Sequence, residues 1–220
     1  MAERPRRRRV LPIALGAAVL AAGVGGGLWY VKPWQGVDVP RGACWDAFTR
    51  DDLATLSGKG HRTVAWQDRK ALTDREYSHD AACDVTWEDD NPLSHSVAKI
   101  STENRDEKFR QAKTGAESTG WEPIRPAPLD FGPGAQGWLF HEGTVQLLVR
   151  CDYPETDGQP SERPYRLVTI TGDRWSSDTP VTEVHRIRIA AALRTARELV
   201  RAQGCTNDPQ LAAREPAAPF

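Results

Sequence analysis

The sequence predicts an α+β domain with a mostly antiparallel sheet flanked by helices, preceded by one transmembrane helix. Three observations predict this arrangement. The N-terminal region holds a long run without charge, all four cysteines follow that run, and segments of strand-like alternation lie between two helical patterns. With 220 residues, the chain has room for one domain of ordinary size beside its tails.

The N-terminal 31 residues have the composition of a membrane anchor. Residues 10–31 carry no charge and would form a helix about 33 Å long, which matches a hydrocarbon core of about 30 Å. Arginines at positions 6–9 precede this run, and basic residues favour the cytoplasmic side. We therefore expect a cytoplasmic tail over residues 1–9, a membrane helix over 10–31 and a C-terminal domain outside the cell membrane.

A cleaved signal peptide is the alternative, because it also begins with basic residues followed by an apolar stretch. The apolar run is long for a signal, and no clear Ala-x-Ala cleavage site follows it. No cysteine follows the run directly, which argues against a lipoprotein anchor. Retention of the helix is the favoured interpretation, and cleavage stays open.

The charge distribution argues against a nucleic-acid partner. The formal charge of the whole chain is -1, and the basic tail contributes four net positive charges, so the remainder is mildly acidic at -5. A domain of this sign lacks the basic footprint of nucleic-acid binding.

The cysteines agree with an exported domain. Cys44, Cys83, Cys151 and Cys205 are even in number and all follow the apolar run, which predicts two disulfides. Of the three possible pairings we favour Cys44–Cys83 and Cys151–Cys205, because each joins segments that a plausible core would bring together. A metal site at His79 and Cys83 is less favoured, since the Cys-x2-Cys spacing of structural zinc is absent.

The first half of the external domain, residues 43–205, follows a linker over 32–42 that is rich in Pro and Gly. A helix is predicted over residues 49–57, with Thr49 as its N-cap and Leu53 and Leu56 facing inward. The alternating segments predict strands over 61–67, 82–88 and 96–101, and a polar segment over 104–116 is compatible with a helix.

The second half begins with a proline-rich extended stretch over residues 123–128. Strands are predicted over 136–141, 144–153 and 165–171. The strongest helical pattern covers 180–203, with Asp178 as its cap and Gly204 at its end, so that Cys205 would pin the helix to the strand of Cys151. Residues 206–220 are mainly Ala, Pro and polar residues, and we expect them to be disordered.

Tryptophan content is the one compositional feature that points to recognition. Trp29 and Trp34 suit the membrane interface, and Trp45, Trp66 and Trp87 are expected to pack the core. The remaining three lie beside predicted loops and form a candidate ligand groove for a glycan, lipid or peptide: Trp121, Trp138 and Trp175.

Signals for catalysis and cofactors are lacking in the sequence. The Gly-x-Ser-x-Gly elbow of many hydrolases does not occur, and the five histidines are scattered on polar stretches. The acidic stretch at residues 88–90 is best explained as a solvated turn, and Gly132-Pro133-Gly134 as a turn without phosphate-binding features. We therefore expect no enzyme activity, no cofactor and no metal.

Two cysteine motifs carry a resemblance. Cys44-Trp45 with the helix after it, and Cys83-Asp84-Val85-Thr86-Trp87, are similar to small extracytoplasmic actinobacterial proteins and lipoproteins of unknown function. In those proteins the first Cys precedes a short helix and the second lies in a Cys-x-x-x-Trp strand; the helix over 189–200 is also similar. This chain departs from them in its second Cys pair and in lacking the lipidated Cys. The resemblance implies location and fold, and it supplies no catalytic residue.

Together these features predict a single-pass, membrane-anchored binding or interaction module outside the membrane, whose ligand is an envelope protein, a glycan or a lipid. An accessory subunit of a cell-envelope complex is the first alternative. An uncharacterised hydrolase is the second.

Overall fold

The computed structural model describes residues 41–57, 62–67, 72, 81–88, 95–114, 126–153, 160–172 and 178–220. Residues 37–220 form one compact unit, and the other unit, residues 1–36, lies outside the described residues. The predicted membrane helix over residues 10–31 is therefore not part of the description. Within the described ranges, no helix combines the length and apolar character needed to cross a membrane.

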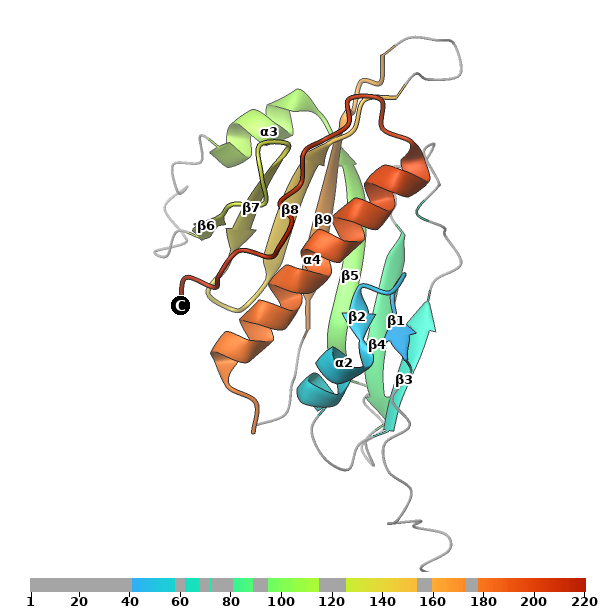
Figure 1. The fold of residues 1–220 in the computed structure, drawn as a ribbon, viewed down its shortest axis with the longest axis vertical. Helices are drawn as coiled ribbons and strands as arrows, with labels where there is room; N and C mark the ends of the chain where they lie inside the picture. Colours follow the sequence, from blue (N-terminus) through green and yellow to red (C-terminus); the bar gives the residue numbers. More distant parts are fainter. Residues whose placement is uncertain are drawn as a thin grey trace, which may run out of the picture. The chain divides into compact units, whose positions relative to one another are not determined.

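A seven-stranded sheet forms the centre of the domain, and all of its described neighbours pair antiparallel. The strand order is β3-β4-β5-β9-β8-β7-β6, so two meanders, β3 to β5 and β6 to β9, meet where β5 pairs with β9 (Figure 1). The strands are β3 (Arg62–Gln67), β4 (Ala82–Glu88), β5 (His95–Arg105), β6 (Ala127–Leu129), β7 (Ala135–Leu139), β8 (Val145–Arg150) and β9 (Tyr165–Thr171). The α+β class and the antiparallel sheet predicted from the sequence are confirmed.

Strand alternation gives the sheet two different faces. Leu147 and Val149 of β8 and Val168 and Ile170 of β9 lie on one face, in the main core. Leu148 and its neighbours on β9 point to the opposite face, because successive side chains of a strand alternate. Helix α3 (Glu107–Thr114) places Phe109 against this second cluster, so helices cover both faces.

Helix α4 (Val181–Gln203) packs on β8 and β9 (Figure 1). Val184, Ile187, Ala191 and Leu199 are buried, as the helical pattern predicts, and residues three and four apart form this apolar stripe. The helix ends at Gly204, whose φ of 62° is the left-handed conformation that glycine adopts readily. The expected cap at Asp178 is wrong, because Pro180 occupies the N-cap position and makes no side-chain cap.

Helix α2 (Arg50–Ser57) is capped as predicted. The Asp52 N–H donates to the Thr49 hydroxyl at 3.2 Å, and the Thr49 N–H donates to the Asp52 carboxylate at 3.1 Å. This reciprocal pair satisfies two backbone donors that the first turn would otherwise leave open. Leu53 and Leu56 are buried, and Arg194 of α4 donates to Asp52 at 2.6 Å, which ties the two helices together.

Both favoured disulfide pairings are confirmed. Cys44 and Cys83 are joined with their Cα atoms 5.5 Å apart, and Cys151 and Cys205 with theirs 4.8 Å apart. Cys44 begins a tight turn between β1 (Gly42–Ala43) and β2 (Phe48–Thr49), in which Cys44, Trp45 and Asp46 all have a positive φ between 56° and 61°. Such left-handed residues cost about 1–2 kcal/mol each, so the disulfide to β4 helps to hold a strained turn.

The boundary between β5 and α3 differs from the expected one. The segment over 104–116 was expected to be compatible with a helix from its first residue, but β5 continues through Arg105 and α3 begins only at Glu107. Pairing explains the difference, because Asn104 and Arg105 lie opposite Arg166 and Tyr165 of β9. A neighbouring strand therefore overrides the weak local preference for helix.

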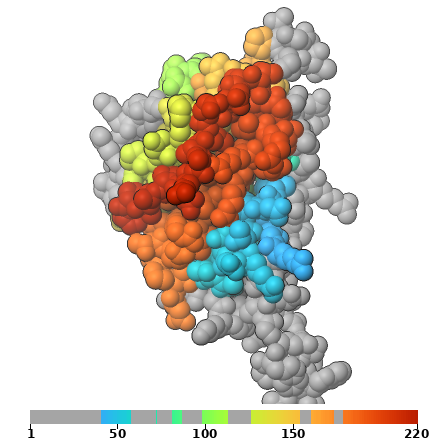
Figure 2. All heavy atoms as spheres, in the orientation of Figure 1, coloured from blue at the N-terminus to red at the C-terminus, as the bar shows by residue number. Residues whose placement is uncertain are grey.

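The expectation that residues 206–220 are disordered is wrong in the structure. This C-terminal segment has no helix or strand, yet its backbone bonds to other parts of the domain: Thr206 N–H donates to Asp152 O at 2.7 Å, and Ala212 N–H donates to Phe131 O at 2.7 Å. Leu211 and Ala218 pack against the main core. Figure 2 shows the C-terminal segment, in the darkest red, as a band across the surface beside α4.

Replacing Leu147 by alanine tests the core between α4 and the sheet. Leu147 is fully buried, so the variant should lose about 2–5 kcal/mol of unfolding free energy through lost contacts and a residual cavity. Denaturant unfolding of the full chain measures this loss. Val181→Ala is the control, because Val181 is 51 % exposed and its truncation should cost no more than about 0.5 kcal/mol. Equal losses in the two variants would contradict the described packing.

Removing the two disulfides one at a time separates their roles. Each closes a long loop, with sequence separations of 54 and 39, so replacing either pair by alanine should cost about 4 kcal/mol. Loss of Cys151–Cys205 should also accelerate hydrogen exchange of residues 206–212, because that bond anchors the start of the C-terminal segment. Loss of Cys44–Cys83 is the matched control and should leave exchange there unchanged. Equal acceleration in both variants would show that the bond does not hold this segment.

Candidate ligand-binding site

Two cavities adjoin at the paired ends of β8 and β9. Arg150, the last residue of β8, lies directly opposite Tyr165, the first residue of β9. Their side chains share the sheet face that α3 covers, because alternation places them with Leu148 and Leu167. Both residues line the larger cavity, which has a volume of about 680 Å³.

The larger cavity lies between the first turn of α3, strands β7 to β9 and the C-terminal segment. Its walls combine guanidinium, carboxylate, amide and phenol groups with proline and small side chains. They comprise Glu107, Arg110, Pro133, Gly134, Ala135, Gln136, Leu148, Arg150, Tyr165, Asn207, Asp208, Pro209 and Gln210. Three distant parts of the sequence therefore meet in one concave site with both polar and apolar walls.

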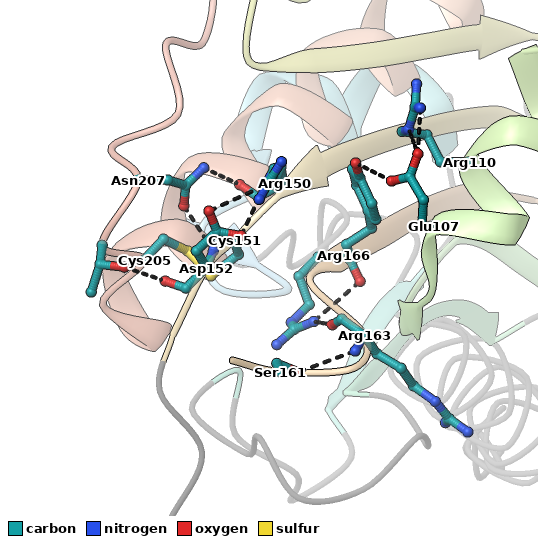
Figure 3. Close-up of polar contacts among 12 residues, drawn as sticks. Glu107, Arg110, Arg150, Cys151, Asp152, Ser161, Arg163, Arg166, Cys205 and Asn207 are labelled. Carbon is teal, nitrogen blue, oxygen red and sulfur yellow. Dashed lines mark hydrogen bonds and ion pairs between the residues drawn. A yellow bond between two sulfur atoms is a disulfide. The ribbon is translucent and has the colours of Figure 1, made fainter. Parts of the chain in front are cut away.

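Glu107 is the most strongly held charge in the larger cavity (Figure 3). It starts α3, it forms an ion pair with Arg110 three residues later, and it accepts a hydrogen bond from the Tyr165 hydroxyl at 2.6 Å. The Arg110 guanidinium and then the Tyr165 hydroxyl lower the pKa of Glu107 to about 2. Burial and the Glu107 charge both raise the pKa of Tyr165. At neutral pH Glu107 is therefore an anion, and neutral Tyr165 donates to it.

Arg150 is held on one side only. Its Nε donates to the two Asp152 carboxylate oxygens at 2.8 and 3.1 Å, and Asp152 raises the pKa of the guanidinium. The side chain is 56 % exposed. Within the part of the chain that the structure describes, neither terminal amino group of Arg150 makes a hydrogen bond. Four N–H donors are therefore open to solvent or ligand.

The smaller cavity has a volume of about 470 Å³ and shares Arg150 with the larger one. Its other lining residues are Asp152, Tyr153, Pro160, Ser161, Pro164 and Thr206. The Ser161 hydroxyl donates to the Tyr153 hydroxyl at 3.4 Å, and the ring of Tyr153 lies 4.7 Å below the Arg166 guanidinium. Arg150 thus stands at the boundary between two cavities that each have polar and apolar lining.

A buried hydrogen-bond network holds the start of β9, which pairs with the end of β8 where Arg150 lies. Arg166 is 1 % exposed; its Nε donates to Gln203 at 2.6 Å, and its Nη1 donates to the Arg163 carbonyl at 2.7 Å. Gln203 in turn donates to the Leu72 carbonyl at 3.1 Å. Because a buried guanidinium without partners would be very costly, these bonds fix β9 against the last turn of α4.

Asn207 clamps the C-terminal segment to the end of β8. Its Oδ1 accepts from the Asp152 N–H at 2.8 Å, and its Nδ2 donates to the Arg150 carbonyl at 3.1 Å (Figure 3). Thr206 adds a hydroxyl bond to the Asp152 carbonyl at 2.9 Å. The neighbouring Cys151–Cys205 bond joins the same two chain segments, so this wall is held by a covalent bond as well as by hydrogen bonds.

Gly134 allows the C-terminal segment to approach the turn before β7. Its N–H donates to the Gln210 carbonyl at 3.2 Å, and a Cβ at this position would lie 2.7 Å from the Gln210 nitrogen. A side chain at residue 134 would therefore push the wall away from the cavity. The glycine-proline turn that the sequence showed is thus a docking surface for the C-terminal segment.

The predicted tryptophan groove is only partly described. Trp138 lies on β7, partly buried against Leu148, Tyr165 and Leu167, and does not line either cavity. Trp121 and Trp175 lie outside the described residues, so the groove stays a prediction. The side chains of Trp66 and Trp87 also lie outside the description, whereas Trp45 packs partly buried against the main core.

Sequence reasoning missed the residues that the fold brings together here. Glu107 and Arg110 lie in a segment that was predicted to be polar and compatible with a helix, and their spacing of three on a helix was the available signal. Arg150 and Tyr165 gave no signal, because their pairing depends on strand register. Among the described residues, no three His, Cys, Asp or Glu side chains gather to hold a metal ion.

Comparison with family models, with curated proteins and with solved structures finds no match to this chain. The resemblance to actinobacterial extracytoplasmic proteins stays a prediction.

Lowering the pH tests the charge of Glu107. A carboxylate whose pKa falls from 4.5 to about 2 on folding adds stability above pH 4.5, and this contribution is lost as the pH falls toward 2. Glu107→Gln should therefore melt below the parent at pH 6, and the gap should close between pH 4.5 and 2. Thermal unfolding of the full chain measures the gap. Glu142→Gln, in the exposed turn between β7 and β8, is the control. A gap that persists at pH 2 would contradict the assigned role.

Proposed function

We propose that the protein is a single-pass, membrane-anchored binding module that takes a polar ligand into the larger cavity outside the membrane. The observation that carries this proposal is the cavity itself. Its volume of about 680 Å³ lies within the 300–1,000 Å³ typical of small-molecule sites, and it has several convergent polar groups.

The side chains that form the cavity walls are held in place by the protein, which supports a binding role. Tyr165, Glu107 and Arg110 hold one another on one side, and Asn207 is fixed by two hydrogen bonds on the other. Walls that are fixed before binding lower the entropy lost when a ligand is immobilised. The same hydrogen bonds would therefore favour affinity and specificity.

The electrostatics of Glu107 favour binding over hydrolysis. A general acid or base works best when its pKa lies near the operating pH. Glu107, with a pKa of about 2, holds no proton at neutral pH and is a weak base. Its chemistry suits a permanent acceptor that orients Tyr165 and Arg110, which is the role of a binding-site residue.

The uncharged run over residues 10–31, with the basic residues before it, supports placing this site near the outer surface of the membrane. A short linker over residues 32–42 would keep the domain close to the bilayer. Ligands presented at the cell envelope, such as glycans, would then be within reach.

Blocking the larger cavity tests the proposal. Full-length protein in detergent micelles would be exposed to a panel of oligosaccharides, short peptides and lipid headgroups, with hydrogen exchange as the readout. A binding member should slow exchange in residues 107–111 and 206–210. Gln136→Trp should abolish that protection, because residue 136 lines the cavity from β7 and an indole would fill it.

Gln146→Trp is the matched control. Residue 146 lies on β8, two residues before Leu148 and on the same sheet face, but it does not line the cavity. Protection that survives Gln136→Trp, or a panel without any protecting member, would contradict a binding role for this cavity.

A further inference from the structure

We infer that the ligand is an acidic oligosaccharide whose carboxylate binds the terminal amino groups of Arg150 and whose sugar units extend into both cavities. This inference rests on the proposed binding function and adds the chemical class of the ligand.

Arg150 offers a fixed and unoccupied fork. Asp152 engages Nε through both of its carboxylate oxygens, which orients the guanidinium plane, while Nη1 and Nη2 stay without a hydrogen bond among the described residues. A guanidinium edge with two parallel N–H donors matches the two oxygens of a carboxylate. Because one side is already held, less side-chain entropy is lost when the other side binds.

The carboxylates of the site are engaged within the protein. Glu107 accepts from Tyr165 and pairs with Arg110, Asp152 pairs with Arg150, and Asp208 accepts from the Gln210 amide at 3.2 Å. A ligand therefore meets open donors on Arg150, whereas the anionic groups are neutralised or bonded. This arrangement favours an acceptor on the ligand.

The balance of charge limits the ligand to a single negative charge at this point. Arg110 and Arg150 face three carboxylates, those of Glu107, Asp152 and Asp208, across the two cavities. These two guanidiniums and three carboxylates sum to -1, so every added negative charge is repelled by the walls, and a phosphate monoester would bring close to two such charges to one point. One carboxylate brings about half of that charge and can use the Arg150 fork, so it is repelled less.

The remaining lining suits a polyhydroxylated chain. Amides of Gln136, Asn207 and Gln210 and the hydroxyls of Ser161 and Thr206 line the cavities. Asn207, Gln210, Ser161 and Thr206 already bond within the protein, and their amides and hydroxyls keep further N–H groups or lone pairs for a ligand. Prolines at positions 133, 160, 164 and 209 present apolar surface between them. Sugar rings carry hydroxyl groups at their edges and C–H groups on their faces, so they match this alternation of polar and apolar lining.

An extended peptide fits less well. Strand addition requires an open sheet edge, but β8 and β9, which carry Arg150 and Tyr165, are both paired on two sides. The cavities therefore open on a sheet face, where backbone groups are not presented. Recognition must come from side chains and from the C-terminal segment.

The position of Arg150 between the two cavities favours a ligand of more than one sugar unit. The residue lines both the cavity of about 680 Å³ and the cavity of about 470 Å³. An acid group bound there leaves room for sugar units on either side. A chain of several units should therefore bind better than one sugar acid.

Tetragalacturonate with three of its four carboxyl groups methyl-esterified, and its fully methyl-esterified form, are the probes, because they differ by one charge and otherwise share the sugar chain. With full-length protein in detergent micelles, calorimetry should show at least tenfold tighter binding of the acid than of the ester. Galacturonate alone should bind more weakly than the acid tetramer. Two further probes are a tetrapeptide of glutamate and alanine, and glucose 6-phosphate. Each of them should bind more weakly than the acid tetramer.

Arginine variants test the contact itself. Arg150→Gln should bring the affinity for the acid down to that for the ester, and Arg150→Lys, which keeps the charge but lacks the fork, should restore only part of the preference. Arg201→Gln is the matched control, since Arg201 is 74 % exposed on α4 and lines neither cavity. Melting temperatures of all variants should match the parent, which excludes unfolding as the cause.

The outcomes separate the two proposals. Equal binding of acid and ester, or an acid preference that Arg150→Gln leaves intact, overturns the assignment of Arg150 and leaves the binding function standing. Tighter binding of the peptide or the phosphate than of the acid tetramer overturns the class of ligand. No binding of the acid tetramer overturns this inference, and only the failure of the whole panel with the larger cavity overturns the binding function.

Discussion

The packing of α4 on β8 and β9, closed at its end by the Cys151–Cys205 bond, is the constraint on which the rest of the domain depends. Leu147, Ile170 and Ile187, one from each of these three elements, are fully buried, so apolar surface of all three is removed from water. Because Cys205 directly follows the helix terminator Gly204, the bond fixes where the chain leaves α4 and in which direction the C-terminal segment starts.

The direction in which the C-terminal segment leaves α4 decides whether this segment reaches the larger cavity and forms one of its walls. Residues 206–212 carry too little apolar surface to fold on their own, and only Leu211 among them packs against the core. They are ordered because one end is tied covalently and because Asp152, Phe131 and Gly134 receive or supply backbone hydrogen bonds along the way. A tethered segment loses less entropy on docking than a free one, so a few bonds suffice.

This also explains how far the sequence could predict the structure. Strands β4 and β9 and the capped helix α2 have the predicted positions, since alternation, a Thr–Asp cap and buried leucines are local signals. Both disulfide pairings were foreseeable from the segments that a core brings together. The ordered conformation of the C-terminal segment was not foreseeable, because the composition of a segment indicates only whether it folds alone. It carries no information about a disulfide next to the segment. The pairing of Arg150 with Tyr165 depends on strand register. Hydrophobic alternation predicts on which face of the sheet a residue lies, but it does not predict which residue of the next strand lies opposite.

The same dependence on register explains why the chemistry of the site is placed at the strand ends. Arg150 lies opposite Tyr165, and Arg166 lies opposite Val149 in the adjacent pair, so alternation places Arg150 on the face of the larger cavity and Arg166 in the interior. Arg166 donates hydrogen bonds to Gln203 and to backbone carbonyls, and these bonds hold the start of β9 in place. Arg150, on the other face, is left with an open fork on a rigid support. Arg166 thus stabilises the strand ends, and the binding role that we propose for Arg150 depends on this rigid support, because specific recognition by a long, flexible side chain requires one.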